Sequence, residues 1–192
     1  MKMNLEVLSI NDIGWDLGEI EENGSTIEEN SLIKAKVIHD FCTKKGITLP
    51  IITDDAGLFV DALNGEPGVY TARYAEEERK ENPELPKYQG VIKLLDKLKN
   101  IDNRNAAYRC EVTCMMPDGT YFQSNGESNG KIAEEIMGEL KKPYFYSVFV
   151  LDGQDKPFSA LTPDELETSY RYIALRNILI ELQERDKKDI ER

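Results

Sequence analysis

The chain has 192 residues, of which 40% are hydrophobic and 31% charged, as is typical of one globular domain with a core of its own. Its 36 acidic and 24 basic residues give a formal net charge of -12, which excludes non-specific binding to nucleic acid because that binding needs a basic surface. The same charge disfavours an anionic substrate unless a metal cation supplies the attraction.

No targeting or membrane segment is evident in the sequence. The first residues lack the apolar core of a signal peptide, and no window approaches the ~20 apolar residues of a membrane-spanning helix. The cysteines Cys42, Cys110 and Cys114 have no CxxC spacing, which favours reduced and buried thiols. We therefore expect a cytoplasmic protein with a single domain over residues 1–192 and with no membrane or nucleic-acid partner.

The first half of the chain predicts two strands and two helices. Residues 4–10, "NLEVLSI", alternate in polarity as a strand does, whereas residues 49–55, "LPIITDD", form the apolar run of a strand buried on both faces. Between them lies a helix that Thr26 and Glu29 cap and Gly46 ends. Its core face consists of Leu32, Ala35, Ile38 and Cys42. A second helix is expected within residues 82–100, with one face made of Tyr88, Val91, Leu95 and Leu98.

The second half predicts a hairpin, a strand and a long helix. Residues 106–124 alternate in polarity on both sides of a Pro-Asp-Gly turn, which indicates a hairpin. Residues 144–151, "YFYSVFVL", are expected to form another strand. Residues 161–188 predict a closing helix, since Thr162, Pro163 and Glu165 make a capped first turn. Together these elements indicate an α/β domain with a mixed sheet.

The acidic residues around the first helix suggest a magnesium site. Asp54 and Asp55 follow the apolar residues of the segment 49–55, at the point where open α/β sheets place ligand-binding groups, and Glu22 precedes the first helix. Mg²⁺ takes one or two protein carboxylates and fills its other positions with water and phosphate oxygens. One carboxylate could also deprotonate a water molecule that attacks a phosphate. The simpler alternative is an exposed Asp-Asp turn, and Glu28 and Glu29 are better explained as complements to the helix dipole.

Two long segments carry a specific resemblance. The segments are "STIEENSLIKAK" and "ITDDAGLFVDALNGEPGVYTARYAEE", followed by "NRNAAYRCEVTCMMPDG" and "NGKIAEE". They resemble the inosine triphosphatase (Ham1-like) family of nucleoside triphosphate pyrophosphatases, and the similarity is dense from about residue 4 to residue 135. The resemblance implies an elongated α/β fold with two lobes, a nucleotide cleft between them, and a homodimer.

The resemblance also implies a reaction and a set of site residues. Such enzymes use Mg²⁺ (Mn²⁺ is an alternative) to hydrolyse inosine, deoxyinosine or xanthosine triphosphate to the monophosphate and pyrophosphate. By matched position, Glu22 is expected to be a metal ligand and Asp55 a metal ligand and the general base. Asp54 and Lys34 would support the phosphates, and Ala56 would contact substrate. The segment 65–73 would be a structural loop beside the cleft.

The sequence departs from the family in three places. The opening strand and the phosphate loop that follows it in the family have no counterpart here, so the domain is expected to be shortened at its start. The segment that stacks on the purine corresponds to "PYFYSVF", in which Phe145 and Tyr146 could still contact the base. The motif that reads the purine oxygen becomes Ser-Tyr-Arg at residues 169–171, and Tyr170 and Arg171 are the substrate contacts expected there. Leu166 stands where a lysine is usual.

These departures leave two hypotheses. The first is a magnesium-dependent pyrophosphatase with altered base selectivity, which the match at Glu22 and Asp55 favours. The alternative is a relative with impaired catalysis that binds a nucleotide or a protein, which the lack of a phosphate loop favours.

Overall fold

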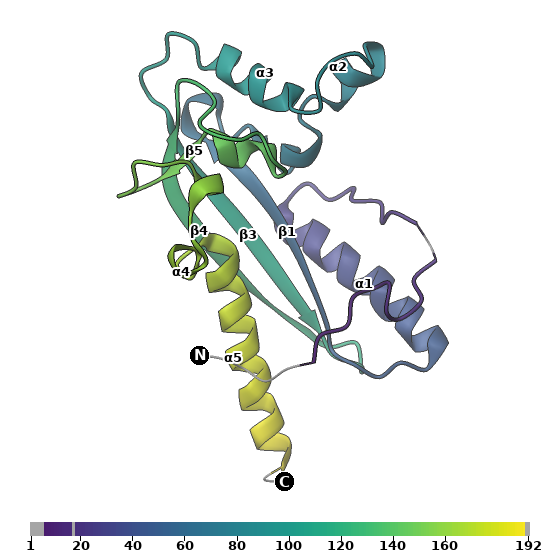
Figure 1. Ribbon diagram of the computed structural model, residues 1–192. Helices are drawn as coiled ribbons and strands as arrows, with labels where there is room; N and C mark the ends of the chain where they lie inside the picture. The colour runs from purple at the N-terminus through teal and green to yellow at the C-terminus, as the bar shows by residue number, and fades with distance from the viewer. Residues whose placement is uncertain (1–5, 17, 191–192) are drawn as a thin grey trace.

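The computed structural model describes residues 6–16 and 18–190, with the side chains of 186–190 excepted. Its centre is a five-stranded sheet of order β2-β1-β3-β4-β5 (Figure 1). The strands are β1 (Ile51–Val60), β2 (Pro67–Gly68), β3 (Asn105–Met115), β4 (Tyr121–Ile132) and β5 (Phe149–Leu151). The α/β class is confirmed, but every described pairing is antiparallel, in contrast to the expected mixed sheet. β3 pairs antiparallel with β1 because the intervening segment returns the chain to the end at which β1 finished.

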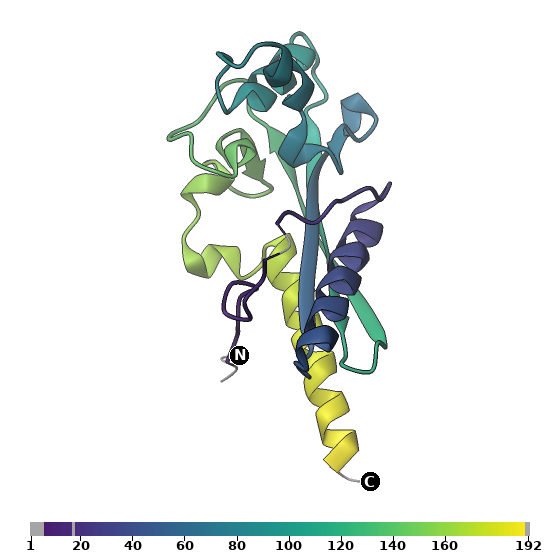
Figure 2. The same ribbon diagram turned by 90° about the vertical axis from the view of Figure 1, so that its right-hand side faces the viewer.

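Two long helices cover opposite faces of the sheet. α1 (Ile27–Lys45) packs on one face of β1 and β3, and α5 (Tyr170–Ile190) packs on the other face, against β3 and β4 (Figure 2). The main core lies beneath α5 and continues into the upper part of the molecule, and a smaller core lies beneath α1. The elongated outline expected from the resemblance is visible in Figure 1. No helix among the described residues is long and apolar enough to cross a membrane.

The capping signals of α1 are confirmed. The side-chain oxygen of Thr26 accepts a hydrogen bond from the backbone N–H of Glu29, and Gly46 ends the helix in the left-handed conformation with φ of 72°. Ala35, Ile38 and Cys42 are buried on the face that was predicted. Local sequence sets these helix ends because each cap satisfies backbone groups that the helix itself leaves unpaired.

The predicted hairpin is also confirmed. β3 and β4 pair in register from Asn105 opposite Lys131 to Met115 opposite Tyr121, around a turn in which Gly119 has φ of +84°. Opposite the middle of β3, Gly126 allows α5 to approach the sheet closely. A Cβ atom at this position would lie 2.0 Å from the carbonyl oxygen of Tyr170. Glycine is therefore needed for α5 to lie on β4.

The upper part of the molecule is built from short elements. α2 (Glu76–Glu81) and α3 (Gln89–Lys97) join β1 to β3, together with the 3₁₀ turns η1 (Asp61–Leu63) and η2 (Thr71–Arg73). α3 confirms the second predicted helix, and its buried face includes Val91, with Leu98 at its end. α2 was not predicted because all six of its residues are charged and none is buried, so no apolar periodicity marks it.

Three expected strands are corrected by the structure. Residues 6–10 form no strand, and residues 4 and 5 lie outside the described part of the chain. Residues 144–147 form the 3₁₀ turn η3 (Tyr144–Ser147), closed by a 2.6 Å hydrogen bond from Ser147 Oγ to the Tyr144 carbonyl, and only the three residues of β5 are strand. β1 runs on to Val60 and is not buried on both faces, since Ile52 is 40% exposed.

The expected closing helix is two helices. α4 (Pro163–Leu166) has the predicted capping box at Thr162 and Glu165, and it ends before α5 begins at Tyr170. The break arises because the backbone N–H of Tyr170 donates to the Ser128 hydroxyl of β4 at 2.8 Å, and Ser128 thereby caps α5 from the sheet. A further 3₁₀ turn, η4 (Phe158–Ala160), precedes α4.

Candidate active site

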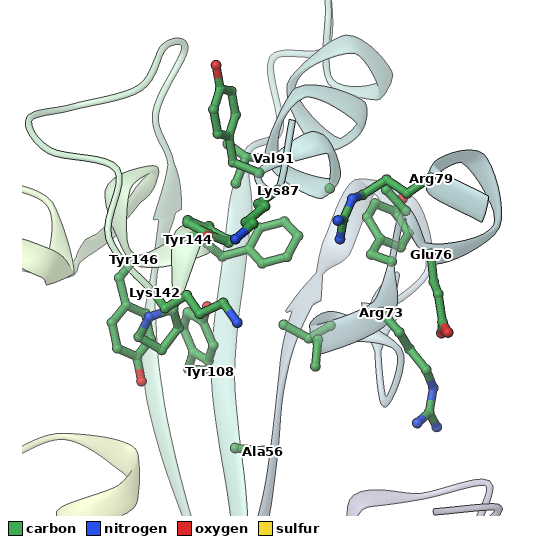
Figure 3. Close-up of a pocket in the computed structure, with 18 of the residues that line it drawn as sticks. Ala56, Arg73, Glu76, Arg79, Lys87, Val91, Tyr108, Lys142, Tyr144 and Tyr146 are labelled. Atoms are coloured by element: carbon green, nitrogen blue, oxygen red, sulfur yellow. The ribbon is translucent and has the colours of Figure 1, made fainter. Parts of the chain in front are cut away.

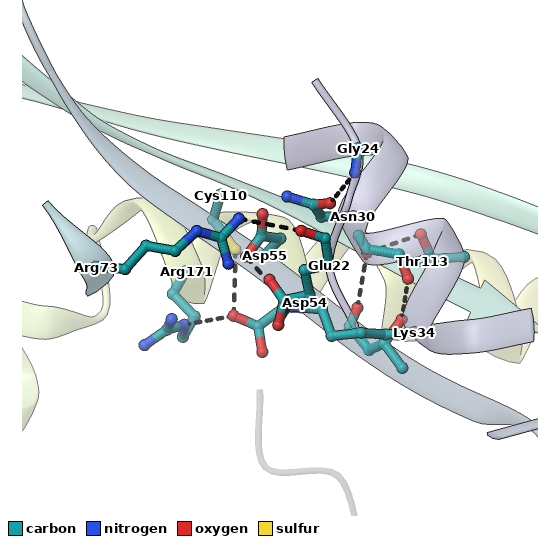
Figure 4. Close-up of polar contacts among 12 residues, drawn as sticks. Glu22, Gly24, Asn30, Lys34, Asp54, Asp55, Arg73, Cys110, Thr113 and Arg171 are labelled. Carbon is teal, nitrogen blue, oxygen red and sulfur yellow. Dashed lines mark hydrogen bonds and ion pairs between the residues drawn. The ribbon is translucent and has the colours of Figure 1, made fainter. Parts of the chain in front are cut away.

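The two adjacent aspartates lie in the middle of β1, not after it as the sequence suggested. Successive side chains of a strand point to opposite faces of the sheet. Asp55 therefore faces α1, and Asp54 faces α5 (Figure 4). The pair consequently serves two different clusters of polar residues.

On the α1 face, Asp55 meets Glu22 across a lysine. The Nζ atom of Lys34 lies 3.2 Å from Asp55 Oδ1 and 3.4 Å from Glu22 Oε1 (Figure 4). The expected metal ligands Glu22 and Asp55 thus lie in one place with Lys34, which was expected to support the phosphates. Arg73 of η2 donates a 3.0 Å hydrogen bond to the backbone carbonyl of Glu22 and holds the segment before α1.

Buried hydroxyl groups fix the position of Lys34. One turn before it, the Ser31 hydroxyl contacts the Thr113 hydroxyl at 2.8 Å, and the Thr53 hydroxyl donates to the Ser31 carbonyl at 2.7 Å. These bonds tie α1 to β1 and β3 at buried positions, where unpaired hydroxyls would be costly. Asn30 adds a bond to the Gly24 N–H at 2.8 Å, which holds the loop that carries Glu22.

Asp55 has one carboxylate oxygen with no partner. Its side chain is 13% exposed, and its Oδ2 atom is buried without a hydrogen bond among the described residues. Burial raises the pKa of Asp55, while Lys34 lowers it and Glu22 raises it. The Asn30 side chain also favours the charged form of Asp55, although its Nδ2 is itself left unpaired in the described structure. An oxygen in this state can accept a proton or bind a cation.

The α1 face fits a magnesium or manganese ion. The described residues hold no group of three or more His, Cys, Asp or Glu side chains that could bind a metal by themselves. Magnesium needs only one or two protein carboxylates when water and substrate phosphates complete its shell. Glu22 and Asp55 supply two carboxylates, and the unpaired Asp55 Oδ2 is an oxygen without a protein partner.

On the α5 face, Asp54 binds Arg171. The Nε atom of Arg171 lies 2.9 Å from Asp54 Oδ2, and the Cys110 thiol donates to the same oxygen at 3.7 Å. Burial and then Asp54 raise the pKa of Cys110 to about 12, so the thiol stays protonated and unreactive. Asp54 thus lies apart from the Asp55 cluster, and its carboxylate holds Arg171 in place.

A pocket of about 660 Å³ lies between α5, β3 and the upper elements (Figure 3). Five predicted substrate residues line it: Ala56, Phe145, Tyr146, Tyr170 and Arg171. The central cleft expected from the resemblance corresponds to this pocket, and Arg73, at the end of the predicted loop, lines it as well. Ala56 follows Asp55 along β1 but faces the α5 side, as Asp54 does. The pocket residue that also contacts the segment of Glu22 is Arg73, so this end of the pocket is the one nearest the carboxylates.

Aromatic side chains build one wall of the pocket. Tyr170 is 1% exposed and stacks on Tyr108, with ring centroids 5.1 Å apart and planes inclined by 13°. The hydroxyl groups of Tyr170 and Tyr146 are hydrogen-bonded to each other. Phe145 is buried and packs against Tyr74 at 6.3 Å. The tyrosine at position 170 is therefore mainly a packed wall residue, and its hydroxyl is already used.

The structure adds lining residues that the sequence did not indicate. These are the basic residues Arg79, Lys87 and Lys142, which come from three separate segments of the upper part. Nothing in the local sequence distinguishes them from the other basic residues of a charged chain. Only the fold brings them to one pocket.

Glu111 is a further acidic residue that the sequence analysis did not single out. It lies on β3 opposite Asp55, is 4% exposed, and burial followed by Glu28 raises its pKa to about 7. An acid with a raised folded-state pKa binds its proton more tightly in the folded protein, so stability falls as pH rises from about 4.5 to about 7.

Glu111→Gln should therefore stabilise the metal-free protein in alkaline solution. We expect a gain on the order of 1 kcal/mol at about pH 8 and almost none at about pH 5, measured by urea unfolding. The exposed Glu84 allows a matched Glu84→Gln control, which should show no such pH dependence. A variant that is equally stabilised at both pH values would contradict this account of Glu111.

Comparison with known proteins gives consistent matches. A sequence model described as the Ham1 family matches residues 1–181. The dITP/XTP pyrophosphatase of Clostridium perfringens is 37% identical over 179 residues, which cover 91% of this chain and 84% of the relative. The protein of the same name from Bacillus subtilis is 35% identical, with 90% and 82% covered. The solved structure of the Staphylococcus aureus Ham1 protein matches with a TM-score of 0.72 and 33% identity, and covers 87% of this chain and 81% of that one. The fold expected from the sequence is confirmed.

Proposed function

The chain belongs to the Ham1 family, and we propose on this premise that it hydrolyses triphosphates of deaminated purine nucleosides to the monophosphate and pyrophosphate. The observation that carries the proposal is the buried, unpartnered Oδ2 of Asp55, a residue that shares Lys34 with Glu22 and whose neighbour along β1, Ala56, lines a pocket of about 660 Å³. Ligand pockets commonly have volumes of about 300–1,000 Å³, so the pocket suits a nucleotide. Inosine, deoxyinosine and xanthosine triphosphates are the proposed substrates.

Asp55 is the proposed general base. Lys34 engages its Oδ1, which leaves Oδ2 to accept the proton of the attacking water. Its raised pKa makes the carboxylate a stronger base than an exposed aspartate. The water oxygen forms a bond to the α-phosphorus, and the bond from that phosphorus to the α–β bridging oxygen breaks. Pyrophosphate leaves, and the proton stays on Asp55.

Glu22 and Asp55 would also hold the metal ion, Asp55 through Oδ1, since Oδ2 is the proposed base. When bound, magnesium or manganese supplies the positive charge that offsets the substrate phosphates against a protein of net charge -12. Lys34 contacts the same two carboxylates and contributes a fixed positive charge at this end.

The structure also supports an altered base selectivity. Arg171 lines the pocket and is oriented by Asp54, so its remaining N–H groups can donate to a base oxygen. The Tyr170 hydroxyl is bonded to Tyr146 and would have to break that bond to contact the base. Because this hydroxyl is not free to bond the 6-oxo group, hydrogen bonding discriminates less strongly between 6-oxo purines and other bases. The homodimer, the cytoplasmic location and the single domain over residues 1–192 stay predictions.

Product identity tests the proposed reaction. With inosine or xanthosine triphosphate, the protein should release phosphate that malachite green detects only after an inorganic pyrophosphatase is added. The activity should disappear when a chelator removes divalent metal and return with Mg²⁺ or Mn²⁺. Direct release of orthophosphate, or full activity in the chelator, would contradict the proposal.

A further inference from the structure

Three cations point into the pocket without an acidic partner. They are Arg79 of α2, Lys87 of the segment before α3, and Lys142 of the segment before η3, and in Figure 3 their charged ends are directed towards the middle of the pocket. Among the described residues, none of the three takes part in an ion pair. Glu76, the acidic residue of the described lining, is paired with Lys80 at 3.2 Å.

Two nearby basic residues are, in contrast, paired with carboxylates. Lys141, next to Lys142, is paired with Glu139, and Lys93 is paired with Glu78. Three cations without an ion-pair partner on one pocket produce a local positive potential in a protein whose net charge is -12.

The three cations face the part of the pocket that would receive the base. Arg73, which holds the segment of Glu22, lines the end of the pocket nearest the carboxylates. In Figure 3 Arg79, Lys87 and Lys142 lie above Ala56, on the side of the pocket where Tyr144 lies. If the phosphates meet the carboxylates, as the proposed function requires, the purine ring lies among these cations and aromatic rings.

The charge of the base then decides how well it fits. The xanthine ring loses a proton near neutral pH because its second carbonyl group helps to delocalise the negative charge, whereas hypoxanthine, with one carbonyl, stays neutral. We propose that Arg79, Lys87 and Lys142 select the anionic xanthine base over hypoxanthine. This inference rests on the proposed function and assigns it a preferred substrate. The three positive charges attract the anionic xanthine ring. A neutral hypoxanthine ring gains no binding energy from them, so the pocket binds xanthine more tightly.

Specificity constants for the two triphosphates test this inference. At about pH 8 the native protein should have a kcat/KM for xanthosine triphosphate about tenfold above that for inosine triphosphate. Replacing Arg79, Lys87 and Lys142 together with glutamine should lower the xanthosine value more than the inosine value and bring the ratio of the two close to one. Lys141→Gln is the matched control, because Lys141 is paired with Glu139 and does not line the pocket, and it should leave the ratio unchanged.

Two outcomes would overturn the inference. One is a native ratio near one, and the other is a triple variant that loses both substrates equally, which would mean that the cations serve the phosphates. If neither triphosphate is hydrolysed, the proposed function fails. Calorimetry with xanthosine and inosine monophosphates then tests the inference independently. Tighter binding of xanthosine monophosphate by the native protein, lost in the triple variant, supports the inference. Equal binding of the two monophosphates contradicts it.

Discussion

Asp55→Asn should lower kcat/KM at least ~10²-fold, because the amide cannot accept the proton of the attacking water. It is also a poor metal ligand, and Glu22 would be left as the one carboxylate of this cluster. The loss should appear in kcat with either triphosphate and should not be recovered by additional Mg²⁺. Steady-state release of pyrophosphate measures it.

Stability separates the chemistry of Asp55 from a role in folding. Burial raises the pKa of Asp55, so the charge is carried at a cost in the folded protein at neutral pH. The variant should therefore unfold at the same urea concentration as the native protein or at a higher one. The exposed Asp96 on α3 offers a matched Asp96→Asn control, which should keep full activity. Near-native turnover of the Asp55 variant would remove this residue from the mechanism.

Gly126→Ala should have the largest effect on stability. The added Cβ would lie 2.0 Å from the carbonyl oxygen of Tyr170 and 3.0 Å from the backbone nitrogen of Ala174, so the first turn of α5 has to move away from β4. Such overpacking against backbone cannot be relieved by a change of rotamer, and we expect a loss of about 3 kcal/mol. Urea unfolding monitored by circular dichroism measures it.

The displacement of α5 should also reach the pocket. Tyr170 and Arg171 stand in the affected turn, so the variant should lose activity at temperatures at which it is still folded. The neighbouring exposed residue Asn125 provides a control on the same strand, and Asn125→Ala should stay within about 0.5 kcal/mol of the native protein. A loss below about 1 kcal/mol for Gly126→Ala would show that α5 tolerates a shift.

Local signals in the sequence predicted the features that depend on neighbouring residues. Thr26 and Gly46 mark the ends of α1, and Thr162 marks the start of α4, because capping involves groups within one turn. The hairpin of β3 and β4 was predicted from its alternation and its turn for the same reason. Tertiary contacts decided the rest. α5 begins at Tyr170 because Ser128 of a distant strand caps it there.

The position of the two aspartates shows why strand limits were missed. Adjacent charges are rare inside strands, so the sequence placed the end of the strand before them. In the structure each charge has a cation on its own side of the sheet, Lys34 for Asp55 and Arg171 for Asp54, and the strand continues to Val60. The aromatic run at residues 144–147 was likewise read as a strand, whereas a tight turn buries Phe145.

The candidate site was predictable in part. Glu22, Lys34 and Asp55 come from matched positions of the resemblance, and the structure brings them together. Their distances and the unpaired oxygen of Asp55 depend on how α1 packs on β1, which no local pattern encodes. Arg79 and Lys142 are far apart in the chain, and only the closed fold places both on one pocket.

The central claim is that water attacks the α-phosphorus of a purine nucleoside triphosphate with Asp55 as the base. Hydrolysis of xanthosine or inosine triphosphate in water enriched in ¹⁸O, followed by mass spectrometry of the products, tests it most directly. The account predicts one ¹⁸O atom in the nucleoside monophosphate and none in the pyrophosphate. Label in pyrophosphate or in orthophosphate, with an unlabelled monophosphate or a diphosphate product, would contradict it.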